Sequence, residues 1–106
     1  MNKDLPVMEQ IVSLITSLVT PEKIILFGSY ARGENKNISD VDILVLVKNL
    51  QNEREVTGKL NKALLKSNIS IPVDFLAADC DKYDSLKSKL GYIYKTIASE
   101  GQVLYG

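Results

Sequence analysis

The segment from Asp40 to Val47, DVDILVLV, constrains the fold more than any other part of the sequence. Successive side chains of a strand point to opposite faces, and residues 43–47 are all apolar, so both faces of this strand would be hydrophobic. A strand of this kind is typical of a sheet that is covered on both sides. We therefore expect residues 40–47 to lie in a sheet that is packed beneath helices.

The rest of the chain supplies further strands and the helices to cover them. Apolar residues at helical spacing predict helices, and short β-branched runs predict strands. In order, the predicted elements are a helix over 4–19, a strand over 23–27, a turn or first helical turn over 29–33, a polar surface loop over 34–39, the strand over 40–47, a helix over 51–67, a strand over 71–77, a helix over 83–99 and a short edge strand over 102–105. The order α-β-β-α-β-α-β predicts an α/β (α+β) fold, with a small mixed β-sheet covered by helices, in a single domain of residues 1–106.

Composition removes several classes of function. Lysine and arginine number 13, as do aspartate and glutamate, so bulk charge gives no support to non-specific nucleic-acid binding. The chain has no histidine, and Cys80 is its one cysteine, which leaves carboxylates as the ligands available to a hard metal ion. The N-terminus lacks the apolar core of a signal peptide, and the apolar runs are too short to span a membrane. We therefore expect a cytoplasmic protein.

Three aspartates occur where strand residues are expected. Asp40 and Asp42 would point to the same face of their strand, where they repel each other and lose hydration. A pair of arginines, a raised pKa or a divalent cation could offset this cost. Asp74 lies between Val73 and Phe75 in the next predicted strand. If the two strands are neighbours, Asp74 can sit beside Asp40 and Asp42, and three such acids resemble a metal cluster. Alternatively, Ser39-Asp40 is a turn, Asp42 faces water at a strand end, and Asp74 is an exposed residue of an edge strand.

A glycine–serine pair follows the first predicted strand. Gly28 permits a tight turn and lets a ligand approach the backbone N–H groups, and Ser29 adds a hydroxyl donor. Arg32 lies three residues beyond Ser29, where its guanidinium could reach a phosphate. Taken alone, the pair is also what an ordinary turn with a helix cap would contain. Together with three acids, it indicates a phosphoryl- or nucleotidyl-transfer site that uses two metal ions.

The residue pattern of these motifs resembles that of a known family. The sequence contains GSYARG from Gly28 to Gly33, SDVD from Ser39 to Asp42, and VDF around Asp74. This pattern is similar to that of the DNA polymerase beta-like nucleotidyltransferase superfamily, and the short length resembles its minimal nucleotidyltransferases, the MNT proteins. The resemblance implies a small mixed sheet with helices and the Mg²⁺-dependent transfer of a nucleoside monophosphate from a nucleoside triphosphate to a hydroxyl.

The resemblance also assigns roles to residues. Gly28 and Ser29 match the triphosphate-binding pair, and Arg32 matches a position that is often basic in the subgroup. The residues that match the three metal-binding, catalytic acids are Asp40, Asp42 and Asp74. The acid at the position of Asp74 is expected to act as the general base that activates the acceptor hydroxyl.

The resemblance further implies a partner. Minimal nucleotidyltransferases are commonly antitoxins paired with a HEPN-domain ribonuclease toxin, and they can transfer AMP from ATP to a tyrosine of that toxin. The predicted elements use nearly all of the chain, which leaves little for an acceptor-binding domain. Two alternatives remain: an antitoxin that only binds its partner stoichiometrically, and nucleotidyl transfer to a small molecule such as an aminoglycoside.

Overall fold

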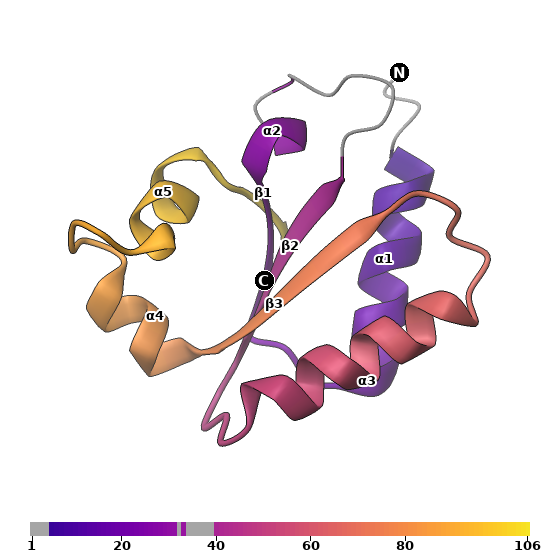
Figure 1. The fold of residues 1–106 in the computed structure, drawn as a ribbon, viewed down its shortest axis with the longest axis horizontal. Helices are drawn as coiled ribbons and strands as arrows, with labels where there is room; N and C mark the ends of the chain where they lie inside the picture. Colours follow the sequence, from indigo (N-terminus) through magenta and orange to yellow (C-terminus); the bar gives the residue numbers. More distant parts are fainter. Residues whose placement is uncertain (1–4, 32, 34–39) are drawn as a thin grey trace.

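The fold is a four-stranded sheet with helices on both faces (Figure 1). The computed structural model describes residues 5–31, 33 and 40–106. In order along the chain, its elements are α1 (Leu5–Leu18), β1 (Lys23–Phe27), α2 (Gly28–Ala31), β2 (Val41–Val47), α3 (Glu53–Leu65), β3 (Val73–Asp79), α4 (Cys80–Leu86), α5 (Ile93–Glu100) and β4 (Gln102–Tyr105). Within these ranges, no helix has the length and apolarity that a membrane span needs.

The sheet is mixed, as the sequence predicts. Its strand order is β3-β2-β1-β4, in which β1 runs antiparallel to β2 and β4, and β2 runs parallel to β3. The strand that is apolar on both faces, β2, therefore lies between two others. Its neighbours satisfy its backbone groups, while the helices cover both of its apolar faces.

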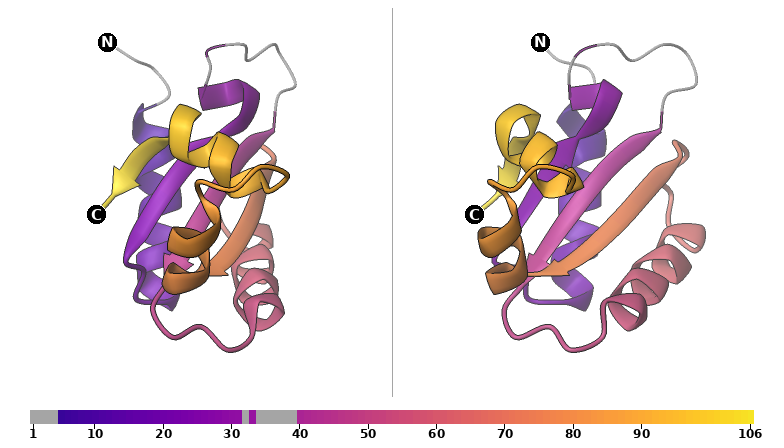
Figure 2. Two further views of the ribbon diagram at one scale, coloured as in Figure 1. Left: turned by 90° about the vertical axis from the view of Figure 1, so that its left-hand side faces the viewer. Right: turned by 60° about the vertical axis from the view of Figure 1, so that its left-hand side comes forward.

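Each face of the sheet carries its own core, and Figure 2 shows the helices on either side of the sheet. On one face, α1 and α3 cover Ile43 and Val45 of β2, and the fully buried Leu60 joins α3 to this cluster. On the other face, α4 and α5 cover Leu44 and Leu46. The alternation of β2 side chains thus divides the protein into two apolar layers, with the sheet between them.

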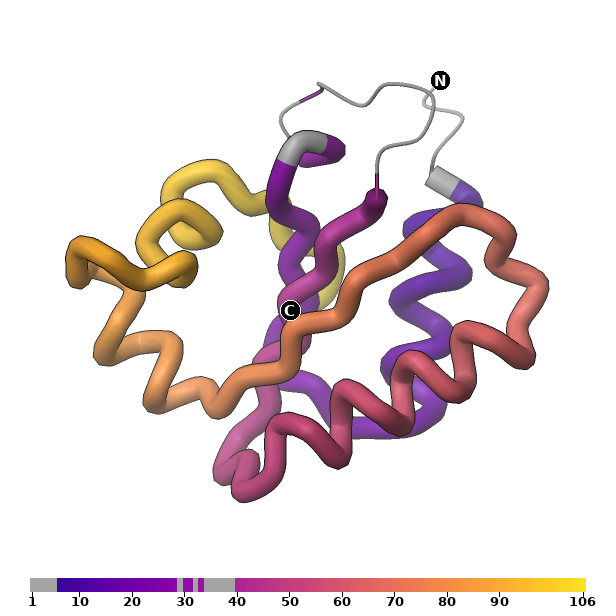
Figure 3. The backbone as a smooth tube through the Cα atoms, in the orientation of Figure 1, coloured from indigo at the N-terminus to yellow at the C-terminus, as the bar shows by residue number. Residues whose placement is uncertain are grey.

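The predicted helix over 83–99 is wrong, because two helices occupy this part of the chain. The chain leaves α4 after Leu86 and re-enters a helix only at Ile93, as the tube in Figure 3 makes visible. Gly91 has a φ of +90°, a conformation that a right-handed helix cannot contain. Leu90, which helical spacing places in the core, is instead 81% exposed.

The start of α4 also differs from the prediction. The helix begins at Cys80 because the Asp79 carboxylate accepts hydrogen bonds from the backbone N–H groups of Asp81 and Lys82, at 3.1 and 3.2 Å. A side-chain acceptor at this position caps a helix N-terminus. The third strand is shifted correspondingly, from the predicted 71–77 to Val73–Asp79.

Candidate active site

The end of β1 and the start of β2 bring a glycine against an aspartate. Phe27 pairs with Asp42 across the antiparallel ladder, and Gly28 follows Phe27 with a φ of +80°. A Cβ atom on Gly28 would strike Oδ2 of Asp42, and it would lie 3.2 Å from Cγ of the same carboxylate. Only glycine therefore lets the turn approach the half-buried carboxylate this closely.

The parallel pairing of β2 with β3 places a second acid beside the first. Asp42 and Asp74 are register partners, so their side chains point to the same face of the sheet. This is the face that α4 and α5 cover further along the strands. Asp42 is half-buried, whereas Asp74 is exposed. The two strands are thus neighbours, which brings two of the three predicted acids together.

The remaining predicted site residues are described to different extents. Asp40 is exposed and directly precedes β2, where the N–H of Val41 donates to the carbonyl of Pro72 at 3.0 Å and holds the strand entrance against β3. The backbone of Ser29 lies in α2, but its side chain is outside the described part of the structure. Arg32 also lies outside the described residues.

The acids fit a metal ion that is shared with a phosphorylated ligand. Among the described residues, no group of three cysteine, histidine or carboxylate side chains is gathered closely enough to hold a metal. Magnesium, however, is commonly held by one or two carboxylates plus the phosphates of a substrate. Asp42 and Asp74, as neighbours on adjacent strands, supply oxygen ligands of this kind.

One contact near this site was not anticipated from the sequence. The side chain of Gln102, at the start of β4, donates from Nε2 to the carbonyl of Ala31 at 3.0 Å. Ala31 is the last residue of α2, the short helix that begins at Gly28. No local pattern could have indicated this bond, because its partners are 71 positions apart in the sequence.

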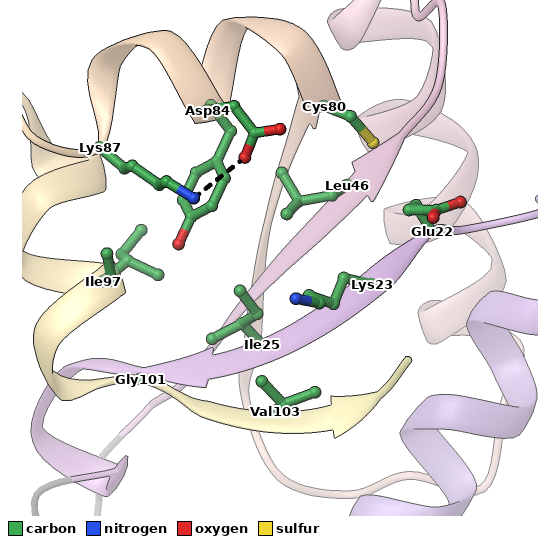
Figure 4. A pocket seen from close by; sticks show the side chains of 12 residues that line it. Glu22, Lys23, Ile25, Leu46, Cys80, Asp84, Lys87, Ile97, Gly101 and Val103 are labelled. Atoms are coloured by element: carbon green, nitrogen blue, oxygen red, sulfur yellow. Dashed lines mark hydrogen bonds and ion pairs between the residues drawn. The ribbon is translucent and has the colours of Figure 1, made fainter.

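A cavity of about 500 Å³ lies on the face of the sheet that α4 and α5 cover (Figure 4). The apolar side chains of Ile25, Leu46 and Ile97 line it, together with Tyr83 and Cys80. Burial raises the pKa of both the Cys80 thiol and the Tyr83 hydroxyl, so both groups are held in their neutral forms. The described residues that line the cavity include none of the predicted site residues. We therefore place the candidate active site at the Gly28–Asp42–Asp74 end of the sheet.

Comparison with known families identifies the class of protein. The chain matches the nucleotidyltransferase domain family over residues 8–104 and belongs to it. The match includes β1, α2, β2 and β3, and hence every residue predicted for the site.

More particular similarities are to proteins concerned with adenylyl transfer. One protein of Methanocaldococcus jannaschii, named as a candidate protein adenylyltransferase, is 42% identical over 55 residues, which are 52% of this chain and 52% of the relative. A second candidate protein adenylyltransferase of that organism is 64% identical over 31 residues, or 29% of this chain and 21% of the relative. The matched segments thus span about half or less of these relatives.

Solved structures extend the similarity to nearly the whole chain. A toxin–antitoxin complex with AMP-PNP is similar with a TM-score of 0.61 and 28% identity, covering 93% of this chain and 73% of that one. A tri-AMPylated HEPN toxin of Shewanella oneidensis in complex with its MNT antitoxin gives a TM-score of 0.59 and 25% identity, covering 97% and 72%. A candidate nucleotidyltransferase from Sulfolobus solfataricus shares the fold, with a TM-score of 0.65 and 23% identity over 95% and 78% of the two chains.

Proposed function

We propose that this protein transfers AMP from ATP to a hydroxyl group of a HEPN-type toxin and thereby acts as its antitoxin. The proposed acceptor is the hydroxyl of a tyrosine. The observation that carries the proposal is the meeting of the Gly28 turn with the Asp42–Asp74 pair at one end of the sheet. Membership of the nucleotidyltransferase family supports the reaction class. Similarity to a complex with AMP-PNP and to one with an AMPylated HEPN toxin supports the nucleotide and the partner.

In this proposal, the turn and the acids divide the work. The Gly28–Ser29 turn binds the triphosphate, with Arg32 as a further phosphate contact. Asp42 and Asp74 would hold Mg²⁺ together with the phosphates, with Asp40 as a further predicted ligand, and the bound ion would neutralise phosphate charge and the charge that develops during transfer. The acceptor oxygen forms a bond to the α-phosphorus as the bond to pyrophosphate breaks.

Asp74 has a second role as the general base that takes the proton of the acceptor hydroxyl. Its carboxylate is exposed, whereas that of Asp42 is half-buried. A tyrosine carried on the surface of another protein can therefore approach Asp74 without entering a deep pocket. This accessibility favours a macromolecular acceptor over a small molecule that would need an enclosed binding site.

Label transfer tests the proposal directly. Purified protein is incubated with Mg²⁺, α-labelled ATP and a HEPN toxin, and we expect label on the toxin. Asp74→Asn should lower the transfer rate by roughly 100-fold or more, as the loss of a general base does, without lowering the melting temperature. Asp81→Asn, which changes an exposed aspartate in the first turn of α4, beyond the opposite end of β3, is the matched control and should retain full activity. Absence of transfer by the folded wild-type protein to a folded toxin would refute the enzymatic function.

A dose series separates catalysis from simple binding. Asp42→Asn should silence the toxin poorly at substoichiometric amounts, because one catalyst can modify many toxin molecules. If this variant neutralises the toxin as well as the wild type at every dose, the protein is a stoichiometric binding antitoxin.

A further inference from the structure

Helix α2, which carries the Gly28–Ser29 turn, is too short to be stable by itself. It spans only Gly28–Ala31, and an isolated helix of one turn does not form in water. Its position must therefore come from tertiary contacts, and it lies against β1, β2 and α5. Between described residues, two hydrogen bonds end on its C-terminal carbonyls: the Gly33 N–H donates to Tyr30 at 3.2 Å, and Gln102 Nε2 donates to Ala31 at 3.0 Å.

The two hydrogen bonds differ in where their donors are located. The bond from Gly33 is local and moves with the turn itself, whereas the bond from Gln102 reaches α2 from another part of the fold. A donor fixed to the sheet can hold the turn in place, which a donor within the same turn cannot do. The C-terminal end of a helix leaves carbonyl groups without helical partners, so Ala31 can accept this bond without losing another.

The backbone that carries Gln102 is itself firmly held. Gln102 pairs with Leu26 in the sheet, and the N–H of the preceding Gly101 donates to the carbonyl of Ile97 at 2.8 Å. A Cβ atom on Gly101 would lie 2.5 Å from Cγ2 of Ile25 and 2.5 Å from the carbonyl oxygen of Ile97. The junction between α5 and β4 is therefore packed against β1, and the Gln102 side chain extends from a rigid base.

We propose that Gln102 is a positioning residue for nucleotide binding. It holds the C-terminal end of α2 against the sheet and so keeps the Gly28–Ser29 turn at the distance from Asp42 that the triphosphate requires. This inference rests on the proposed function, in which that turn binds the triphosphate. Because the bond ends on the backbone of α2, its loss weakens nucleotide binding and leaves the chemical step unchanged.

The test replaces Gln102 with leucine, which keeps the approximate size but removes the donor. Gln51→Leu is the matched control, since Gln51 is also exposed and lies between β2 and α3, at the other end of the sheet. The measurements are the Kd for AMP-PNP, the KM for ATP, kcat for AMP transfer to the toxin, and Tm. Gln102→Leu should raise Kd and KM by about two- to tenfold, the worth of one hydrogen bond, with kcat within about twofold. Gln51→Leu should match the wild type in all four.

A second variant and a structural readout complete the test. Gln102→Asn keeps the amide but is one methylene shorter, so it should also lose the reach to Ala31 and raise KM. Amide hydrogen exchange at Gly33, whose N–H donates to Tyr30, should become faster in both variants. A KM equal to that of the wild type would overturn the inference, as would a fall in Tm with no change in KM. Failure of the folded wild-type protein to bind AMP-PNP would instead refute the proposed function.

Discussion

Replacing Gly28 with alanine probes the fold and the candidate site together. The Gly28 backbone has a φ of +80°, which costs an L-residue about 1–2 kcal/mol. In addition, the new Cβ would strike the Asp42 carboxylate. Rotating that side chain away from its preferred conformation costs about 0.5–1.5 kcal/mol. We therefore expect Gly28→Ala to lower the free energy of unfolding by about 1.5–3.5 kcal/mol.

Gly91 offers a matched control for the backbone strain. Its φ is +90°, but among the described residues no atom outside its chain neighbours lies within 4 Å of a Cβ placed there. Gly91→Ala should therefore show the strain alone, about 1–2 kcal/mol. The difference between the two variants, about 0.5–1.5 kcal/mol, measures the displacement of the Asp42 carboxylate.

The assays are urea denaturation for stability and AMP transfer for activity. Gly28→Ala should lose AMP transfer, because its Cβ displaces a proposed metal ligand, whereas Gly91→Ala should keep it. Equal destabilisation by the two substitutions would refute the steric part of the reasoning. Full activity of Gly28→Ala would refute the link between the turn and Asp42.

Three further predictions concern stability and reactivity. Leu60→Ala, at a fully buried position, should cost about 2–5 kcal/mol in urea denaturation, whereas Leu65→Ala, at a side chain that is 87% exposed, should cost less than about 0.5 kcal/mol; equal costs would contradict the assigned core. Hydrogen bonds from backbone N–H groups, above all that of Leu50, hold the pKa of Asp79 below its ordinary value of 3.8 in the folded state. The ionised Asp79 carboxylate therefore stabilises the fold fully above about pH 3.8, and this stabilisation is lost as the pH falls through the folded pKa. Asp79→Asn should therefore reduce the loss of stability between about pH 6 and about pH 3 in denaturation experiments, and an unchanged pH dependence would contradict this. Because burial raises the pKa of Cys80, its alkylation by iodoacetamide at about pH 8 should be slower in the native protein than in urea, and equal rates would contradict this cause.

Local patterns predicted most of the elements because each pattern reflects how its own segment is buried. The boundaries of β1 and β4 agree with the sequence, and those of α1 and β2 differ by one residue. The last helix was mispredicted because the apolar spacing of Leu86, Leu90 and Ile93 continues across a turn. At Gly91 the backbone conformation, which spacing does not reveal, ends that periodicity.

The sequence by itself determined that this chain forms a covered mixed sheet, because a strand that is apolar on both faces requires two covering layers. It also identified aspartates at unusual strand positions and a glycine at a turn. Only the tertiary structure decided that Asp74 pairs with Asp42, that Gly28 lies against the same carboxylate, and that Gln102 reaches Ala31. Strand register and long-range hydrogen bonds depend on how distant segments pack against one another, and a local pattern carries no information about the partner it will meet.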